Sequence, residues 1–591
     1  DLVSIAHRHG MRILGPASMG IISTVPKVSM QATYAPVTLI PGRVAFSSTS
    51  GPLGVALLEQ AHRAGVGISH FVALGNKADV STNDFLQYWE GDDATSVMAL
   101  HIGSFGNPRK FTRIARRVSK AKPIVAVKTG GGDEDRTVDA LFRQTGVIPV
   151  AEIAQLFDVA RVLDSQPLPG GERVVVLSNA HGAHALAQAA LAGAGLRLAE
   201  LSADTRGHLA AILPNGATVA NPVDLTFGAE PADYDGALRS VLADGGVDAA
   251  IVIFASALPE RHGDVADVIV AAHVAHPTKP VLASVLGVED RGLRDDAGHV
   301  VPAFAFPETA VATLGRVAEH ARWKRRPEGI TPDPVGLGID LERAEALVAH
   351  ALDVRPSGTL LPWSVAAELL GLFGIGVAPA VAVASLHDAL AAAGRLGYPV
   401  ALKATGMTRV GRSEEAGVAL DLHDDDAVRG AYRRMSDGLG IGMNEALVQT
   451  MIRPGLETAV GIHHDPTFGP VVTFGLGGAF ASAIADTATR VTPLTESDAA
   501  DLVRSARAWG VLEGGDYAVD AVEDLLLRVG MLADLMPEIA QLTMNPVLIS
   551  ATSATAVDLS LRVAPPPPDP NPAARRMLRM APAEAPEPAR R

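Results

Sequence analysis

Short apolar runs, each followed by a turn of small residues and then by a helical segment, recur between residues 42 and 323. Residues 42–54 pass from such a run into a Ser/Gly-rich turn, and residues 173–177 lead into another turn at 178–182. Buried strands that alternate with helices form a parallel sheet, because each connecting helix covers a face of that sheet. The pattern therefore predicts an α/β fold with two such blocks.

The chain has 591 residues, too many for one hydrophobic core, so we expect three or four domains. A net charge of -15 argues against nucleic acid as a main partner. The absence of cysteine excludes disulfides, thiolate metal sites and a cysteine nucleophile, and it fits a cytoplasmic protein. No apolar run reaches the ~18–20 residues of a membrane span, so we expect no membrane partner.

A third block carries residues that point to chemistry. Residues 400–402 form an apolar run that ends on Lys403, as expected of a buried strand that brings one cation to the edge of a cleft. Residues 405–417 follow with three glycines and with Arg409 and Arg412. Such a segment predicts a loop that closes over an anion.

The next apolar run, residues 447–451, predicts a strand whose exposed backbone edge could hold a flat base. Glu457 follows within a second apolar stretch. A carboxylate placed in the middle of a buried strand is costly without a partner, so we expect Glu457 to meet a ribose hydroxyl or a metal.

Asn545 and Asp558 each lie in or beside an apolar strand further along. Mg²⁺ prefers oxygen ligands and takes only one or two of them from protein when phosphates and water complete its shell. One asparagine and one aspartate therefore suffice as a magnesium pair. Taken singly, Lys403 could be a surface lysine, Asn545 a turn starter and Asp558 a strand-end carboxylate.

In this order, the residues resemble the ATP-grasp domain of the NDP-forming acyl-CoA synthetases, relatives of succinyl-CoA synthetase. The resemblance implies an α/β fold of two flavodoxin-like, succinyl-CoA-synthetase-type domains followed by an ATP-grasp domain. It implies Mg²⁺, ATP and CoA as cofactors. By position, it assigns Lys403 to the phosphates, Gln449, Thr450 and Met451 to the adenine, Glu457 to the ribose, and Asn545 and Asp558 to Mg²⁺. Arg490 also matches a family arginine, which would answer part of the charge of an acidic pair at 414–415.

The turn of the first block keeps Ser48, Ser50 and Gly51 of the family pattern. Small residues at a helix N-terminus can present N–H groups and hydroxyls to an anion, and the alternative is a simple helix cap. The resemblance favours the binding site. We count it as half of a CoA site, because the family's upstream phosphate turn is not in this sequence.

The family's phosphoryl carrier is expected to be missing. The resemblance places a phosphohistidine loop after Lys128, but here residues 129–137 lead almost directly into a helix. No histidine occurs between His101 and His181, and Gly103 stands where the family has the glutamate that steadies the phosphohistidine. A phosphohistidine needs a nucleophilic imidazole and a group that orients it, so both requirements fail. Acidic residues 133–135 would also repel a phosphoryl group.

The expected domains follow from these blocks. They are residues 1–38, the end of a Rossmann-like CoA-binding domain that begins upstream; 42–166 and 172–323, the flavodoxin-like domains; 324–354, a linker; 355–563, the ATP-grasp domain; and 564–591, a disordered Pro/Ala/Arg tail.

Two functions remain open. One is a ligase that converts ATP, a short carboxylic acid and CoA into ADP, phosphate and acyl-CoA, impaired by the missing loop. The other is a catalytically degenerate regulatory module that binds ATP or acyl-CoA. Residues 83–88 and 106–111 resemble family members that are fused to lysine acetyltransferase domains. A homo-oligomer is possible in either case.

Two histidine pairs, His181 with His184 and His463 with His464, suggest a metal site. We interpret all four as surface or helix-cap histidines, because no carboxylate lies at ligand spacing in the sequence.

Overall fold

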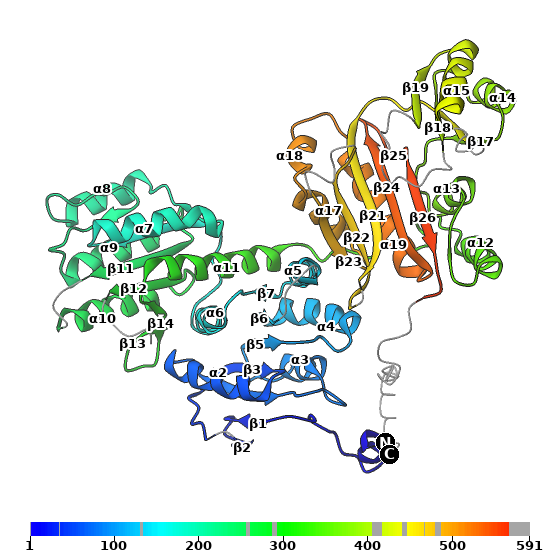
Figure 1. Ribbon diagram of the computed structural model, residues 1–591. Coiled ribbons are helices and arrows are strands. Elements are labelled where there is room, and N and C mark those ends of the chain that lie inside the picture. Colours follow the sequence, from blue (N-terminus) through cyan, green and yellow to red (C-terminus); the bar gives the residue numbers. More distant parts are fainter. Residues whose placement is uncertain are drawn as a thin grey trace, which may run out of the picture.

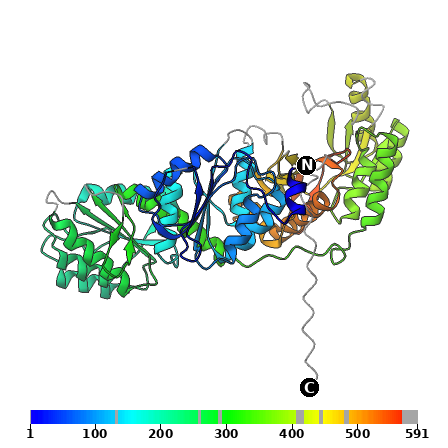
Figure 2. The same ribbon diagram turned by 90° about the horizontal axis from the view of Figure 1, so that it is seen from below.

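The computed structural model describes residues 2–34, 36–129, 134–255, 260–286, 292–404, 417–439, 446–465, 467–478 and 486–566. Figure 1 shows two α/β bodies and a larger two-sheet body, with the first α/β body between the other two. The view from below in Figure 2 shows the same order along the molecule. The predicted tail from residue 567 onward lies outside the described residues.

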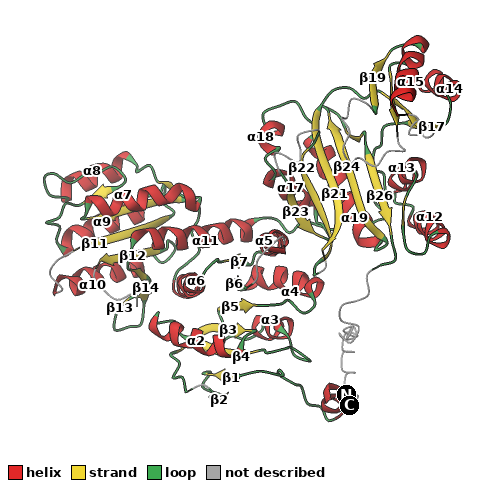
Figure 3. Ribbon diagram, viewed as in Figure 1, coloured by secondary structure: helices red, strands yellow, loops and turns green. Residues whose placement is uncertain are grey.

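The first body is a seven-stranded sheet in the order β2-β1-β4-β3-β5-β6-β7. Its strands from β4 to β7 run parallel, while β1 is antiparallel to both of its neighbours. Helices cover both faces (Figure 3). The elements are α1 (Leu2–Arg8), β1 (Gly20–Ser23), β2 (Met30–Thr33), β3 (Pro41–Ser48), α2 (Gly51–Arg63), β4 (Ile68–Ala73), α3 (Thr82–Glu90), β5 (Val97–Ile102), α4 (Pro108–Ala121), β6 (Ile124–Lys128), α5 (Glu134–Thr145), β7 (Ile148–Pro149) and α6 (Ile153–Ser165).

The second body is a parallel sheet in the order β10-β8-β11-β12-β15, with β9 beside β8. Its elements are β8 (Arg173–Ser178), α7 (His181–Leu191), β9 (Arg197–Leu198), α8 (Ala203–Ile212), β10 (Val223–Asp224), α9 (Pro231–Ala243), β11 (Ala249–Ala255), α10 (Glu260–Ala275), β12 (Val281–Leu286), β13 (Leu293–Arg294), β14 (Val300–Val301), β15 (Ala303–Phe304) and α11 (Pro307–Arg325). The predicted alternation of buried strands and helices is confirmed in both bodies, because each central strand carries an apolar run.

The third body holds two sheets. The larger has the order β16-β26-β24-β21-β22-β23, with β25 beside β24, and the smaller has the order β17-β20-β18-β19. The larger sheet contains β16 (Thr359–Leu360), β21 (Leu456–Asp465), β22 (Gly469–Leu476), β23 (Ala488–Val491), β24 (Ile539–Ile549), β25 (Ala554–Ala556) and β26 (Leu559–Val563). The smaller contains β17 (Ala380–Val383), β18 (Val400–Ala404), β19 (Val418–Leu422) and β20 (Ala446–Thr450).

Helices cover these two sheets: α12 (Leu341–Val354), α13 (Trp363–Leu372), α14 (Leu386–Leu396), α15 (Asp425–Leu439), α17 (Glu496–Ser505), α18 (Trp509–Leu512) and α19 (Val519–Leu535). Helix α12 lies in the segment that we interpreted as a linker. It buries Ala344 and Val348 in the core of the larger sheet, so this part of the segment packs with the third body.

One hydrophobic cluster joins the first body to the third. It contains Phe105, Phe111 and Phe142 together with Phe468, Val471 and Val491. The rings of Phe105 and Phe468 pack edge to face with centroids 5.1 Å apart. Beside them, Gln144 Nε2 donates to Val491 O and Val491 N donates back to Gln144 Oε1. The two bodies therefore share a buried core.

The second body meets the first through helix α11. Gly146 follows α5, and a Cβ atom there would lie 2.3 Å from the Trp323 ring, so only glycine leaves room for this contact. Lys120 of α4 lies over the same ring, 4.8 Å from its centroid. Among the described residues, no helix combines the length and the apolar character that crossing a membrane requires.

Candidate functional site

Lys403 and Gln449 meet at one main-chain carbonyl. Lys403, on β18, donates from Nζ to Val557 O at 2.9 Å, and Gln449, on the neighbouring β20, donates from Nε2 to the same oxygen at 3.1 Å. Val557 lies between β25 and β26 of the larger sheet. Two side chains of the smaller sheet therefore bond to the larger sheet, at the residue that directly precedes Asp558.

Asn545 and Asp558 lie side by side. Strand β24 pairs with β26 up to Met544 and with β25 from Val547 onward, so Asn545 falls at the break between the two partners. There Asn545 N donates to Asp558 O at 3.1 Å. An amide oxygen and a carboxylate are suitable ligands for Mg²⁺, and both side chains are half-buried, so the pair fits the predicted ion.

Gly478 links Glu457 to this pair. Its N–H donates to Asn545 Oδ1 at 2.8 Å. A Cβ atom on Gly478 would lie only 1.9 Å from Glu457 Oε2, and its φ of +80° also favours glycine. Five predicted residues, Lys403, Gln449, Glu457, Asn545 and Asp558, are thus connected through Val557 and Gly478.

Two arguments from the sequence are wrong. Strand β20 is paired with β17 on one side and with β18 on the other, so residues 447–450 present no exposed backbone edge. Glu457 is exposed near the start of β21, so burial does not force it to find a partner. Glu457 lies close to Gly478 because of the path of the two strands, and not because its carboxylate is buried.

Three other residues are assigned to the nucleotide: Thr450 and Met451, which directly follow Gln449, and Arg490. The main-chain N–H groups of Thr450 and Met451 donate to Pro379 O and Pro399 O. Arg490, on β23, is 6 % exposed, and its guanidinium donates to Thr489 O, Asp501 O and Ser505 Oγ. Burial lowers the pKa of Arg490 despite the nearby Asp501 and Asp498. The structure therefore directs this guanidinium toward α17.

The predicted anion loop, with Arg409 and Arg412, lies outside the described residues up to 416. Its two flanks are described. Lys403 ends the register of β18 with β19 opposite Val418, and Ala404 N donates to Gly417 O. Both ends of the loop therefore lie beside Lys403.

The second predicted site lies where β3 leads into α2. Ser48 is fully buried, and its Oγ donates to Ser50 O and lies 2.9 Å from His101 Nδ1. Ser50 is the residue before α2, and its side chain makes no capping bond. Gly51 packs against Met19, whose Cγ would be 2.4 Å from an added Cβ. Ser50 therefore stands at the N-cap position of α2, as the helix-cap alternative expects, but its hydroxyl does not cap the helix.

Gly103 lies beside Thr49 at the same edge. Gly103 N donates to Thr49 Oγ1 at 2.8 Å, and a Cβ on Gly103 would lie 2.9 Å from that oxygen. A side chain at position 103 would therefore displace Thr49. Of the acidic residues at 133–135, no side chain is among those described.

Sequence reasoning missed Lys77 and His101. Lys77 has a positive φ of 53°, and its Nζ donates to Ser104 Oγ at 2.7 Å. Burial lowers the pKa of Lys77 to about 8. His101 is 3 % exposed, and burial lowers its pKa as well. Lys77 lies in the turn after β4, and His101 is the second-last residue of β5. A cation in a glycine-containing turn and a lone imidazole in an apolar strand are the only signals that could have singled them out.

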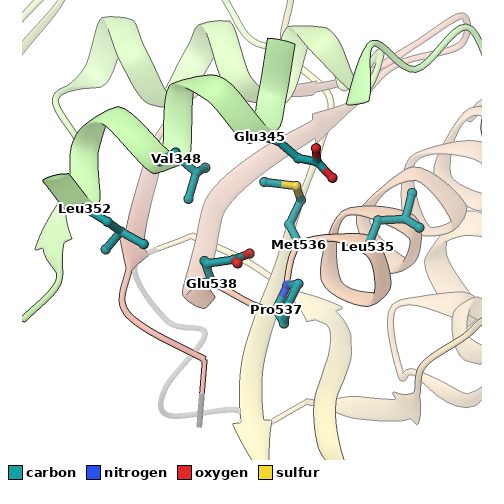
Figure 4. Close-up of a pocket in the computed structure, with 8 residues that line it drawn as sticks. Glu345, Val348, Leu352, Leu535, Met536, Pro537 and Glu538 are labelled. Atoms are coloured by element: carbon teal, nitrogen blue, oxygen red, sulfur yellow. The ribbon is translucent and has the colours of Figure 1, made fainter. Parts of the chain in front are cut away.

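A hollow of about 470 Å³ lies elsewhere in the third body, between α12 and the end of α19 (Figure 4). Glu345 and Val348 line it from α12, and Met536 and Glu538 line it from the other side. None of the predicted site residues contributes to its lining.

Three family models match the chain. A succinyl-CoA ligase like flavodoxin domain matches residues 41–163, a ligase-CoA domain matches 174–330, and an ATP-grasp domain matches 354–563. They confirm the fold class predicted from the sequence.

Relatives cover nearly the whole chain. Acetate–CoA ligase (ADP-forming) I of Archaeoglobus fulgidus is 30% identical over 586 residues, which are 95% of this chain and 83% of that protein. The 4-hydroxybutyrate–CoA ligase (ADP-forming) of Nitrosopumilus maritimus is 27% identical over 93% of this chain and 82% of its own length. A crystal structure of a Pyrococcus horikoshii OT3 protein is similar over 55% of this chain and 74% of its own, with a TM-score of 0.50 and 32% identity.

Proposed function

The chain belongs to the ADP-forming acyl-CoA synthetase family, and from this membership we propose that it binds Mg·ATP but does not complete the family's ligase reaction. In that reaction ATP, a carboxylic acid and CoA give ADP, phosphate and acyl-CoA. The observation that carries the proposal is the contrast between two sites: the nucleotide residues are connected in the structure, while the sequence after Lys128 lacks the histidine of the family's phosphoryl carrier.

The proposed binding of Mg·ATP is supported by the connected residues around Val557 and Gly478. Lys403 supplies a positive charge between the two sheets, where a phosphate chain would lie. Glu457 is exposed beside Gly478 and is available to a ribose hydroxyl. Asn545 and Asp558 would hold Mg²⁺, which would offset the charge of the phosphates. These roles agree with the order of the residues in the sequence.

The proposed loss of phosphoryl transfer concerns the sheet edge formed by β3, β5 and β6. Gly103 has no side chain to orient an imidazole, and its N–H is bonded to the Thr49 hydroxyl. His101 is the nearest candidate imidazole in the sequence, but it is buried and its Nδ1 faces Ser48 Oγ. A buried imidazole cannot travel to a second site, so it cannot replace a carrier on a mobile loop.

The substrates that we propose are ATP, CoA or acyl-CoA, and a short carboxylic acid. The names of two relatives, an acetate ligase and a 4-hydroxybutyrate ligase, support a short acid, whereas a third is named a trans-feruloyl-CoA synthase. Ser48, Ser50 and Gly51, at the N-terminus of α2, are the residues that we assign to CoA.

The test is to incubate the intact protein with γ-labelled Mg·ATP and to measure binding in parallel by calorimetry. We expect saturable nucleotide binding, no acid-labile phosphoprotein, and no acyl-CoA when acetate and CoA are added. An acid-labile phosphohistidine would overturn the proposed loss of phosphoryl transfer. Absence of nucleotide binding would overturn the ATP-grasp assignment instead.

The second function rests on the same loss of turnover and gives the bound ligand a role: a regulatory module that responds to nucleotide or acyl-CoA, as in a protein acetyltransferase. The missing carrier histidine favours it, because binding can survive the loss of transfer. A ligand-dependent change in hydrogen exchange at both sites, without product, would support this function over an impaired ligase.

A further inference from the structure

Two histidines and an aspartate meet at one edge of the second body. Strand β8 ends at Ser178 and leads into α7, which begins at His181, and β10 ends at Asp224 directly opposite Ser178. The carboxyl ends of parallel strands lie at the same edge of a sheet, so the start of α7 faces the end of β10. The expectation that no carboxylate accompanies these histidines is therefore wrong, because Asp224 is distant only in the sequence.

The three residues lie close enough to share an ion. One ligand atom from each of His181, His184 and Asp224 lies within 4.8 Å of the other two. The two histidines are three residues apart, which places them on the same face of α7, with ring centroids 4.6 Å apart. His181 Nδ1 and Asp224 Oδ2 are 3.7 Å apart, too far for a hydrogen bond. The two side chains are therefore neighbours that are not bonded to each other.

His184 supplies a second, independent observation. It is 8 % exposed, and its Nδ1 is buried without a hydrogen-bond partner among the described residues. A buried polar atom without a partner is costly, so the nitrogen needs a ligand that the described chain does not supply.

Asp224 is held in place while His181 can adjust. Asp224 Oδ1 accepts a hydrogen bond of 2.9 Å from Thr226 N. A tetrahedral ion with bonds of about 2.0–2.2 Å needs its ligands about 3.4 Å apart, so the group must close by roughly 1 Å. The His181 side chain is 84% exposed and can rotate to do so.

We propose that His181, His184 and Asp224 form a binding site for a divalent transition metal, Zn²⁺ above all. Two imidazoles and one carboxylate are a ligand set that suits this ion, and three protein ligands leave the fourth position open for water or an acidic ligand. The site lies in the second body and is independent of the proposed nucleotide site.

The test uses the intact, untagged protein after chelator treatment, titrated with Zn²⁺ in competition with a chromophoric chelator. We expect one bound equivalent whose affinity falls at least about 10-fold in His184→Gln and in Asp224→Asn. His181→Gln gives the same loss with little risk to folding, because this side chain is exposed. The matched control is His299→Gln, which removes an exposed histidine that also pairs with a carboxylate, Asp295, at 2.7 Å.

His299→Gln should bind Zn²⁺ as the parent protein does. Failure of the parent protein to take up one equivalent would overturn the site. Equal affinity in the parent and in His181→Gln would overturn it as well, because that variant keeps the fold and loses one ligand.

Discussion

Lys403 Nζ donates a hydrogen bond of 2.9 Å to the main-chain carbonyl of Val557, the residue that directly precedes Asp558. This contact ties a cation on the smaller sheet to the strand connection that carries a proposed metal ligand on the larger sheet. Nucleotide binding should depend on it, because the ammonium and the metal would act on the same phosphates.

Replacing Lys403 by alanine should weaken Mg·ATP binding by ~1–3 kcal/mol, the size of a charge-assisted contact. Isothermal titration calorimetry measures this difference. The control is Lys27→Ala, which removes an exposed lysine of the first body. Equal affinities in Lys403→Ala and in the parent protein would count against the phosphate role of this residue.

Replacing Gly478 by alanine should also impair Mg·ATP binding, because the new Cβ would collide with Glu457 Oε2. A backbone with positive φ is strained in any variant with a side chain, so this strain must be controlled separately. Gly397→Ala provides the control: Gly397 has a φ of +82°, and no described atom lies within 4 Å of an added Cβ. If both variants lose the same affinity, the contact with Glu457 does not matter for binding.

Replacing Asp79 by asparagine should loosen the N-terminal segment. Burial opposes ionisation of Asp79, but hydrogen bonds from Arg12, the Ile13 N–H and His7 outweigh it and lower its pKa to about 2. Exchange of the Ile13 amide hydrogen should become at least about 10-fold faster, since one hydrogen bond to a charged group is worth more than ~1.4 kcal/mol. Unchanged protection of this amide would show that the carboxylate charge is not what holds the segment.

The same pKa sets the direction of a pH effect. Because the pKa of Asp79 is lower in the folded protein than its ordinary value of 3.8, its stabilising contribution is complete above that value. The contribution is lost as the pH falls through about 2. The acid sensitivity of the Ile13 amide should therefore disappear in Asp79→Asn.

Lys77 should become a reactive amine near pH 8, because burial lowers its pKa to about 8 from 10.5. Competitive acetylation with mass-spectrometric detection gives the pH profile, and the exposed Lys27 serves as the internal reference. Between these two values the unfolded chain binds the proton more tightly, so the contribution of Lys77 to stability rises with pH. A profile for Lys77 that matches that of Lys27 would contradict the effect of burial.

The fold could be predicted largely because its signals are local. Strands β8, β11 and β18 carry short apolar runs, and the sequence after each run is rich in small residues, so the type and order of the elements follow from neighbouring positions. Residues of the candidate site, such as Lys403 at the end of an apolar run, carry the same kind of signal.

The missed features depend on which strands become neighbours. Strand β20 loses its expected open edge because β17 pairs with it, although the two are far apart in the sequence. Asp224 reaches His181 only because β10 lies beside β8. Arg490 turns toward α17, the helix that directly follows β23, because its acceptors Asp501 and Ser505 lie there. Pairing of distant segments is not encoded in any single window of the sequence.

The aromatic cluster around Phe105 and Phe468, with the reciprocal hydrogen bonds of Gln144 and Val491 beside it, has a further consequence. Arg116 of the first body also donates two hydrogen bonds, of 2.7 and 3.0 Å, to the carboxylate of Asp498 in the third. Covalent continuity is therefore not needed to keep these parts together. A chain nicked by protease in the exposed stretch 327–336 should still elute from a sizing column as one particle, and its fragments should separate only in denaturant.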